Sequence, residues 1–284
     1  MADTYEGTYG TLTMSEDGEW TYVLDNASED VQALGEGVFV DDQITVISDN
    51  DTKLVVTVRV TGTNDLPDIT LTATDSAVAE DSDTSASGTI SIADVDTEDA
   101  SYLAYSSVEM VADGWTLDGN TNTWSQTSNY GTIVFNPDTG AYVYTLDNSS
   151  EAVQGLKSGS SETDTFTIHV TDGWGTSTKD IAITVTGQQD APTVTVGDVS
   201  GDLAEEGTLT ATATVTAADV DAGETAVVSP IDMAIGGWTL VDGSDSDYTK
   251  AGTYGTAVFD SLTGVVTYTL DNESSAVQDL GSAT

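Results

Sequence analysis

Apolar and polar residues alternate along short stretches of this 284-residue chain. Leu12 and Met14 precede the turn-forming residues 16–18 (Glu-Asp-Gly), and a second alternating run follows over 20–24. Successive side chains of a strand point to opposite faces, so this pattern predicts a hairpin with one apolar face. The pattern recurs over 133–146, where the alternate positions are largely aromatic. We expect that hairpin to present an aromatic face to a core.

A second type of alternating run precedes two proline-containing segments. Its apolar positions are Val56, Val58 and Val60 in the first case and Ile181, Ile183 and Val185 in the second. No helical period separates the runs, and Thr, Ser, Val and Gly are abundant, a composition that favours strands and turns. Several short strands at this spacing predict an all-β fold made of Greek-key β-sandwiches.

The chain repeats itself with a long and nearly constant period. Three segments align, starting at Gly7, Asn129 and Gly252, and each contains the motif Leu-Asp-Asn. The asparagines of this motif, Asn26, Asn148 and Asn272, lie 122 and 124 residues apart. A period of that length corresponds to one domain per repeat. We therefore predict tandem sandwiches joined end to end.

Asp-x-Pro elements at 65–67 and 190–192 mark the expected joints between these repeats. The predicted division is a C-terminal part of a first repeat over 1–65, a complete repeat over 66–190, and an N-terminal part of a third repeat over 191–284. Each incomplete part lacks strands that the complete repeat contains. One hypothesis is that the two parts complement each other between molecules, head to tail.

The charge of the chain is strongly negative, with 5 Lys and Arg against 49 Asp and Glu and a net charge of -44. Such a charge disfavours nucleic acid and anionic membranes as partners, and cations are needed to offset the repulsion. Cysteine is absent, which excludes disulfides. No stretch approaches the roughly 18 apolar residues of a membrane span. The first residues also lack the pattern of a secretory signal.

Catalytic motifs are missing from the sequence. His169 is the single imidazole and lies in an alternating strand, where we align it with Val46 of the first repeat and expect a strand-surface residue. Neither a GxSxG nor an HExxH motif occurs. Paired carboxylates of a glycosidase are compatible with the composition. However, the acidic residues recur with each repeat, whereas active sites are usually single, and we expect no enzyme activity.

Two Asp-Val-Asp motifs give the clearest indication of a metal site. They contain Asp94 and Asp96 in the complete repeat and Asp219 and Asp221 in the third. Alternating carboxylates point to the same side and repel each other unless a cation lies between them. Ca²⁺ takes six to eight oxygen ligands, more than one short loop usually supplies, so a joint between domains is a suitable place for it.

A family resemblance accounts for nearly the whole chain. Its motifs are Gly-Thr-Tyr-Gly at 7–10, Trp-Thr-Tyr-x-Leu-Asp-Asn at 20–26, Val-Gln-x-Leu at 31–34, Thr-Asp-Thr-Phe-Thr-Ile-x-Val-x-Asp-Gly at 163–173, and Ile-Thr-Val-Thr-Gly at 183–187, before an Asp-x-Pro joint. These motifs resemble the VCBS repeat. The resemblance implies cadherin-like or immunoglobulin-like extender domains of a giant extracellular bacterial adhesin of the RTX type, acting in cell adhesion or biofilm formation.

The order of acidic motifs also resembles that of cadherins, which implies Ca²⁺ ligands at each joint. The first joint would use Asp25, Glu29, Asn64, Asp65, Asp94, Asp96 and Asp172. The second joint would use Glu80, Asp147, Glu151, Asp190, Asp219 and Asp221. Other roles stay open: Asp25 and Asp147 could form Asx turns, and Asn64-Asp65 could form a plain linker turn.

Residues 113–131 depart from the shortest form of the family by an additional hairpin-like segment, which the third repeat also contains. Its aromatic residues Trp115, Trp124 and Tyr130 could bind a glycan or a surface protein, or they could pack in a core. The expected partners are therefore neighbouring repeats, with a glycan, a protein ligand or further copies of the chain as alternatives.

Overall fold

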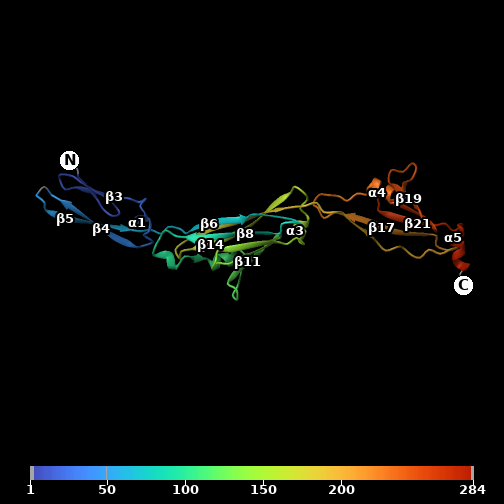
Figure 1. The fold of residues 1–284 in the computed structure, drawn as a ribbon, viewed down its shortest axis with the longest axis horizontal. Helices are drawn as coiled ribbons and strands as arrows, with labels where there is room; N and C mark the ends of the chain where they lie inside the picture. The colour runs from blue at the N-terminus through green and yellow to red at the C-terminus, as the bar shows by residue number, and fades with distance from the viewer. Residues whose placement is uncertain (1–2, 49, 283–284) are drawn as a thin grey trace. The chain divides into compact units, whose positions relative to one another are not determined.

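The computed structural model describes residues 3–48 and 50–282, and it consists mainly of β-strands (Figure 1). Compactness divides it into two units. Unit 1 comprises Met1–Val153 and Ser160–Thr186, and unit 2 comprises Gln154–Gly159 and Gly187–Thr284. The predicted repeat boundaries are a finer division and stay a prediction. Among the described residues, no helix is both long enough and apolar enough to cross a membrane.

The first part of unit 1 contains two small sheets. Its elements are β1 (Asp3–Glu6), β2 (Gly10–Met14), β3 (Trp20–Leu24), α1 (Glu29–Gln32), β4 (Phe39–Ile47) and β5 (Lys53–Thr61). Strands β1, β2 and β3 pair in that order, and β4 pairs with β5. Leu12, Ile44 and Val46 form a small core with Tyr5, Met14, Tyr22 and Val56 around it. The predicted first hairpin, β2–β3, is confirmed.

The rest of unit 1 is a complete β-sandwich. Its elements are β6 (Asp68–Asp75), β7 (Ala77–Ala79), β8 (Ser85–Ala93), η1 (Asp99–Ser101), β9 (Ala104–Tyr105), α2 (Ser107–Ala112), β10 (Thr116–Asp118), β11 (Thr123–Thr127), β12 (Gly131–Phe135), β13 (Ala141–Leu146), α3 (Glu151–Gln154), β14 (Ser161–Thr171) and β15 (Thr176–Thr186). One sheet has the order β10-β11-β12-β13-β8-β6, and the other has the order β7-β15-β14-β9. Consecutive β6 and β7 thus belong to different sheets, as expected for an immunoglobulin-like Greek key.

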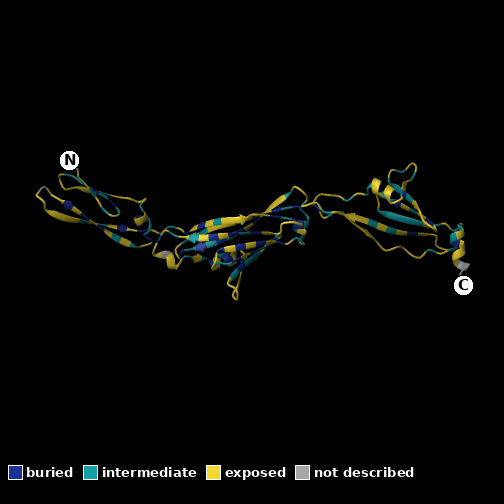
Figure 2. Ribbon diagram, viewed as in Figure 1, coloured by how far each residue is buried: buried dark blue, intermediate teal, exposed yellow. Residues whose placement is uncertain are grey.

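The core of this sandwich lies between the two sheets (Figure 2). Phe135, Tyr142 and Tyr144 are at most 1% exposed, so the predicted aromatic face of the second hairpin is confirmed. Phe166 and Trp115 pack edge-on against each other across this core. The prediction of an all-β fold built from sandwich repeats is therefore confirmed.

Unit 2 contains one six-stranded sheet. Its elements are β16 (Thr193–Val196), β17 (Thr210–Ala218), α4 (Pro230–Ile235), β18 (Thr239–Leu240), β19 (Asp247–Ala251), β20 (Gly255–Asp260), β21 (Val265–Leu270), α5 (Ser275–Gln278) and η2 (Asp279–Ser282). The strand order is β16-β17-β21-β20-β19-β18, which repeats the larger sheet of the complete sandwich. The described residues of unit 2 include no counterpart of the β14–β15 hairpin.

One sequence alignment was wrong by a single residue. Asp42 and Asp164 are both buried at the start of equivalent strands, β4 and β14. Counting from them, His169 is equivalent to Ile47, and Val46 is equivalent to the buried Ile168. The difference arises because a period-two pattern fits equally well after a shift that exchanges the two faces. The buried aspartates fix the correct register.

Candidate metal centres at the repeat joints

The first joint is organised by the Asp-Val-Asp segment that follows β8. The backbone N–H of Asp96 donates to Oδ1 of Asp94 over 2.9 Å, which closes an Asx turn. Oδ2 of Asp96 accepts a hydrogen bond from the backbone N–H of Asp65 in the linker, at 2.8 Å. Asp96 is only 1% exposed. The second carboxylate of the motif thus holds the linker by its backbone.

A second pair of residues continues this group. Nδ2 of Asn64 donates to Oδ2 of Asp172 over 3.0 Å and to the carbonyl of Asp65 over 2.6 Å. Oδ1 of the fully buried Asp172 accepts the backbone N–H groups of Trp174 and Gly175, each at 2.6 Å. Burial raises the pKa of Asp172, but these donors outweigh it and hold the pKa below the usual 3.8. Asp172 is therefore ionised at neutral pH.

Two oxygens of this group are buried without a hydrogen-bond donor. They are Oδ1 of Asn64 and Oδ2 of Asp94. A buried acceptor without a partner costs about 1–3 kcal/mol, and native proteins rarely keep one without a reason. The surrounding donor set consists of carboxylate and amide oxygens, which are the ligands that Ca²⁺ prefers. The residues present therefore fit a calcium ion.

The second Asp-Val-Asp segment repeats this arrangement inside unit 2. The N–H of Asp221 donates to Oδ1 of Asp219 at 3.0 Å, and the N–H of Asp190 donates to Oδ2 of Asp221 at 3.0 Å. Oδ1 of the buried Asp221 has no hydrogen-bond partner. Carboxylate oxygens of Asp219, Asp221 and Glu224 lie within 4.8 Å of one another. Three carboxylates this close repel strongly unless a cation is present.

Backbone contacts join the loop after each Asp-Val-Asp segment, and the glycine after strand β5 or β15, to the loop that follows α1 or α3. The N–H of Thr97 donates to the carbonyl of Ala33 at 3.3 Å, and the N–H of Ala222 donates to the carbonyl of Gly155 at 3.0 Å. A Cβ added at Gly62 would overlap with the carbonyl of Leu34, and one added at Gly187 would overlap with that of Leu156. The two glycines therefore permit a close backbone approach at equivalent positions.

Asp25 and Glu29 are the two ligands expected from the first repeat at the first joint. Both are exposed, and Oδ1 of Asp25 accepts the N–H of Ala27 at 3.3 Å. Among the residues that the structure describes, no hydrogen bond joins either side chain to Asn64 or Asp172. Asp25 thus closes an Asx turn, and the metal role of Asp25 and Glu29 stays a prediction.

The three candidates expected from the complete repeat at the second joint lie in unit 1. Glu80 is fully buried at the end of β7, and its N–H donates to Thr186 O at 3.0 Å. Asp147 accepts Ser149 N–H and Oγ–H, at 3.1 and 2.7 Å, and these bonds lower its pKa. Glu151 is exposed at the start of α3. Their metal role stays a prediction.

Two acidic residues were missed by sequence reasoning. Glu224 completes the close carboxylate group of unit 2. Glu36 accepts the backbone N–H of Asn64 through Oε2 at 3.3 Å. Glu224 follows Asp221 by three residues, a spacing that could have identified it. Glu36 has a serine, Ser158, at the equivalent position of the next repeat, so no repeated signal marked it.

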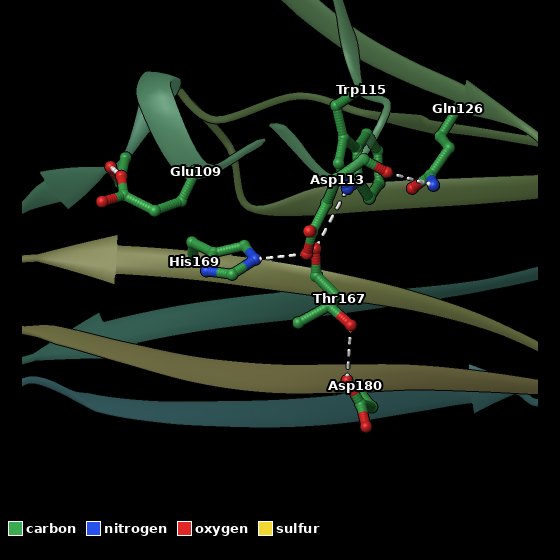
Figure 3. Close-up of polar contacts among 8 residues, drawn as sticks. Glu109, Asp113, Trp115, Gln126, Thr167, His169 and Asp180 are labelled. Carbon is green, nitrogen blue, oxygen red and sulfur yellow. Dashed lines mark hydrogen bonds and ion pairs between the residues drawn. The ribbon is translucent and has the colours of Figure 1, made fainter. Parts of the chain in front are cut away.

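The inserted segment contributes to the core rather than to an aromatic surface. Trp115 is 2% exposed and Trp124 is 5% exposed, and Nε1 of Trp115 donates to the carbonyl of Thr167 at 3.0 Å. Figure 3 shows this bond beside the pair formed by His169 and Asp113, whose Nε2 and Oδ2 atoms are 2.6 Å apart. These tryptophans are therefore not available as a glycan platform.

The chain was compared with known protein families, curated proteins and solved structures. No family model matches the sequence. No curated protein matches it either. Among solved structures, the chain is similar to Protocadherin Gamma B2 extracellular cadherin domains 1-5, with 16% identity, a TM-score of 0.34, and coverage of 95% of this chain and 44% of that chain.

Two further solved structures are similar to the chain. The first is PcdhgB3 EC1-4, with 14% identity, a TM-score of 0.37, and coverage of 95% of this chain and 57% of that one. The second is surface layer protein SbsC, domains 4-9, with 13% identity, a TM-score of 0.22, and coverage of 94% and 34%. The chain therefore spans about half the length of the two protocadherin structures.

Proposed function

We propose that this chain is a series of calcium-stiffened spacer domains from a large extracellular bacterial surface adhesin of the VCBS-repeat type. The observation that carries the proposal is the recurrence of one arrangement at two joints. In both, an Asp-Val-Asp segment binds the linker backbone, and a buried carboxylate oxygen, of Asp94 or Asp221, faces no donor. A repeated structural role fits this recurrence better than a single active site does.

Calcium would supply positive charge at the joints of this strongly acidic chain. The acidic groups of each joint lie well within a Debye length, which is about 8 Å at physiological salt, so they repel one another. A bound Ca²⁺ turns the same groups into shared ligands of a linker and a domain. At the first joint, Asn64, Asp94, Asp96 and Asp172 would hold the ion. At the second joint, Asp219, Asp221 and Glu224 would hold the ion.

The biological role follows from stiff joints. Domains that keep a fixed orientation to their neighbours project a distant ligand-binding region from the cell, which serves cell adhesion or biofilm formation. The principal partners are then the neighbouring repeats of the same chain. In this proposal the chain has no catalytic activity, and the recognised surface or molecule is bound elsewhere in the adhesin.

A calorimetric calcium titration tests the proposal. Asp94→Ala combined with Asp96→Ala should remove the binding at the first joint while the aromatic core stays folded. The matched control is Asp242→Ala with Asp245→Ala, which removes two exposed carboxylates outside the joints and should leave binding unchanged. Unchanged stoichiometry and affinity in the first variant would contradict the metal assignment.

Stiffening is tested separately by small-angle scattering in calcium and in chelator. Calcium should increase the maximum dimension of the particle, because the repelling joints sample many angles without it. Magnesium serves as a control for ionic strength, since its smaller octahedral shell suits these sites less well. Identical profiles in calcium and chelator would show that calcium binds without stiffening the chain.

A further inference from the structure

The asparagine of the Leu-Asp-Asn motif in the complete repeat follows a candidate ligand directly. Asp147 is that candidate, and Asn148 is the asparagine. Oδ1 of Asn148 accepts the backbone N–H of Asp81 at 2.9 Å, and Nδ2 of Asn148 donates to Oδ1 of Asp81 at 2.6 Å. The two residues are 67 positions apart in the sequence. One side-chain amide thus binds both the backbone and the carboxylate of a distant residue.

These two bonds join two loops that each contain a candidate calcium ligand. The loop after β13 contains Asp147, and the turn after β7 contains Glu80, which precedes Asp81. Glu80 is fully buried. Its backbone N–H donates to the carbonyl of Thr186 at 3.0 Å, so pairing with the end of β15 holds the residue on one side. The amide of Asn148 holds it on the other side, through the next residue of the chain.

The backbone of Asp81 has a conformation that residues with a Cβ rarely adopt. Its φ angle is +58°, in the left-handed region where the Cβ is crowded and glycine is preferred. Such conformations persist where the surrounding structure fixes them, and they are concentrated at functional sites. The two hydrogen bonds to Asn148 provide this support. A glycine would adopt the same φ without strain, but it would offer no carboxylate to Asn148.

The turn that contains Asp81 recurs in unit 2. Glu206 has the equivalent position there, with a φ of +59°, and a glutamate precedes the left-handed residue in both turns. In both, the alanine two residues earlier donates its N–H to the carbonyl four residues further along, at 2.7 and 3.0 Å. In the described part of unit 2, no hydrogen bond joins Glu206 to Asn272. The turn is therefore common to both repeats, and the pair with the asparagine belongs to the complete one.

Another asparagine of the same sandwich provides a contrast. Oδ1 of Asn136 accepts the backbone N–H groups of Asp138 and Thr139, at 2.9 and 3.2 Å, within one turn between β12 and β13. That turn contains none of the candidate calcium ligands. Asn148 differs because its partner is distant in sequence and adjoins Glu80. A side chain that connects two ligand-bearing loops controls how far apart their carboxylates lie.

We infer that Asn148 is a positioning residue of the calcium site at the second joint. By holding Asp81, it keeps the turn with Glu80 in a fixed place relative to the loop with Asp147. Both polar atoms of its amide are engaged by Asp81, so Asn148 acts through its neighbours and not as a ligand. The inference rests on the proposed function, with Glu80 and Asp147 among the ligands. Residues that orient metal ligands in this way commonly tune the affinity of the site.

Calorimetry on the full chain tests this inference. Asp94→Ala with Asp96→Ala first removes binding at the first joint, so that the second joint is measured alone. Loss of a residue that orients metal ligands typically lowers the affinity about 10- to 100-fold, so Asn148→Ala should weaken binding at the second joint at least about tenfold. Asn136→Ala is the matched control, because it also removes a side chain that makes two hydrogen bonds. It should leave the calcium affinity unchanged.

A substitution at the partner residue tests the mechanism. Glycine adopts a positive φ without support, so adding Asp81→Gly to Asn148→Ala should restore most of the lost calcium affinity. Asp81→Ala, which keeps the strain and removes the carboxylate, should weaken binding in the same sense as Asn148→Ala. Combining the two alanine substitutions should weaken it little further, because each removes the same interaction. Melting temperatures in chelator measure stability without the ion, and Asn148→Ala should differ little there from Asn136→Ala.

Three results would overturn the inference while leaving the proposed function in place. They are unchanged affinity in Asn148→Ala, equal weakening by Asn136→Ala, and no recovery on adding Asp81→Gly, each with normal calcium binding by the unaltered chain. A merely structural role of Asn148 would lower the melting temperature in chelator without changing the affinity. Failure of the proposed function gives a different result, since the unaltered chain would then bind no calcium at either joint.

Discussion

At the first joint Asn64 donates its amide to Asp172, whereas at the second joint the equivalent Gln189 donates to Asp221 and Glu224, at 2.5 and 2.8 Å. The backbone part is nevertheless the same, since the next residue of each linker donates its N–H to the second aspartate of an Asp-Val-Asp segment. The local motif thus fixes the linker backbone, and more distant residues complete the group of candidate ligands.

The difference predicts unequal affinities. Asp172 is fully buried and held by two backbone N–H groups, so its carboxylate is positioned before an ion arrives. Glu224 is exposed and carries a longer side chain, which loses more rotamer freedom on binding. A preorganised site binds more tightly because less ordering remains to be done. We therefore expect the first joint to bind calcium more tightly than the second.

The largest expected effect comes from Asp172→Ala. It removes a buried ligand of the first joint, and we expect a loss of about 100-fold in calcium affinity there, similar to the larger effects of removing groups that support a metal. The second joint should be unaffected in the single variant. Combining it with Asp219→Ala and Asp221→Ala removes the second site, so a titration of that variant isolates the affinity of the first. Equal weakening of both joints would mean that the two sites are not independent.

Replacing the glycine at the close backbone approach should lower the stability of the fold by a similar amount at both joints. Gly62→Ala and Gly187→Ala each place a Cβ against a carbonyl oxygen, of Leu34 and Leu156. We expect each to destabilise the fold by about 1–3 kcal/mol, the usual cost of overpacking. Thermal melts in chelator measure this without the contribution of calcium. Gly119→Ala is the control, because a Cβ there meets no atom within 4 Å.

The lowered pKa of Asp172 gives a pH dependence with a defined sign. A carboxyl with a pKa depressed on folding stabilises the protein above its unfolded pKa of about 3.8, and the contribution is lost as the pH falls through the folded value. Melting temperature in chelator should therefore decline below about pH 4. Asp172→Asn should make this decline shallower. An unchanged acid limb would show that Asp172 is not charged in the folded state.

The smallest expected effect concerns the linker amides. Exchanging their lengths, with Asn64→Gln in one variant and Gln189→Asn in another, keeps the amide group and moves it by one methylene. We expect a change of only a few fold in the calcium affinity of the joint concerned, because the backbone N–H contacts of Asp65 and Asp190 remain. A loss as large as that of Asp172→Ala would show that the position of the amide oxygen, rather than the backbone contacts, limits calcium binding.

Period-two patterns predicted the central hairpins and their core faces, since alternation directly reflects the two sides of a strand. The Asp-Val-Asp motif was equally readable. Its second aspartate accepts a backbone N–H of the linker, and the two residues lie 31 positions apart in both repeats. The short helices α2 and α4 were missed, since six residues are too few to show a helical period. The passage of β6 into β7 was also missed, because sheet exchange at Ser76 has no local sequence signature.

The juxtaposition of the candidate ligands was less readable from the sequence than the strands. Asn64, Asp65, Asp94, Asp96 and Asp172 are brought together at the first joint. Their contacts depend on a linker, a strand end and a hairpin turn that are distant in sequence. Such juxtaposition is a property of the folded topology, and only repetition of the motifs made it partly visible.

Strand β7, the second strand of the complete repeat, pairs in parallel with β15, its last strand. Ala77, Val78 and Ala79 lie opposite Thr184, Val185 and Thr186. If the two ends of the domain are pulled apart, tension runs along both strands in opposite directions and loads their hydrogen bonds in shear. The bonds must then break together rather than one after another. The complete repeat thus contains a mechanical clamp between its second and its last strand.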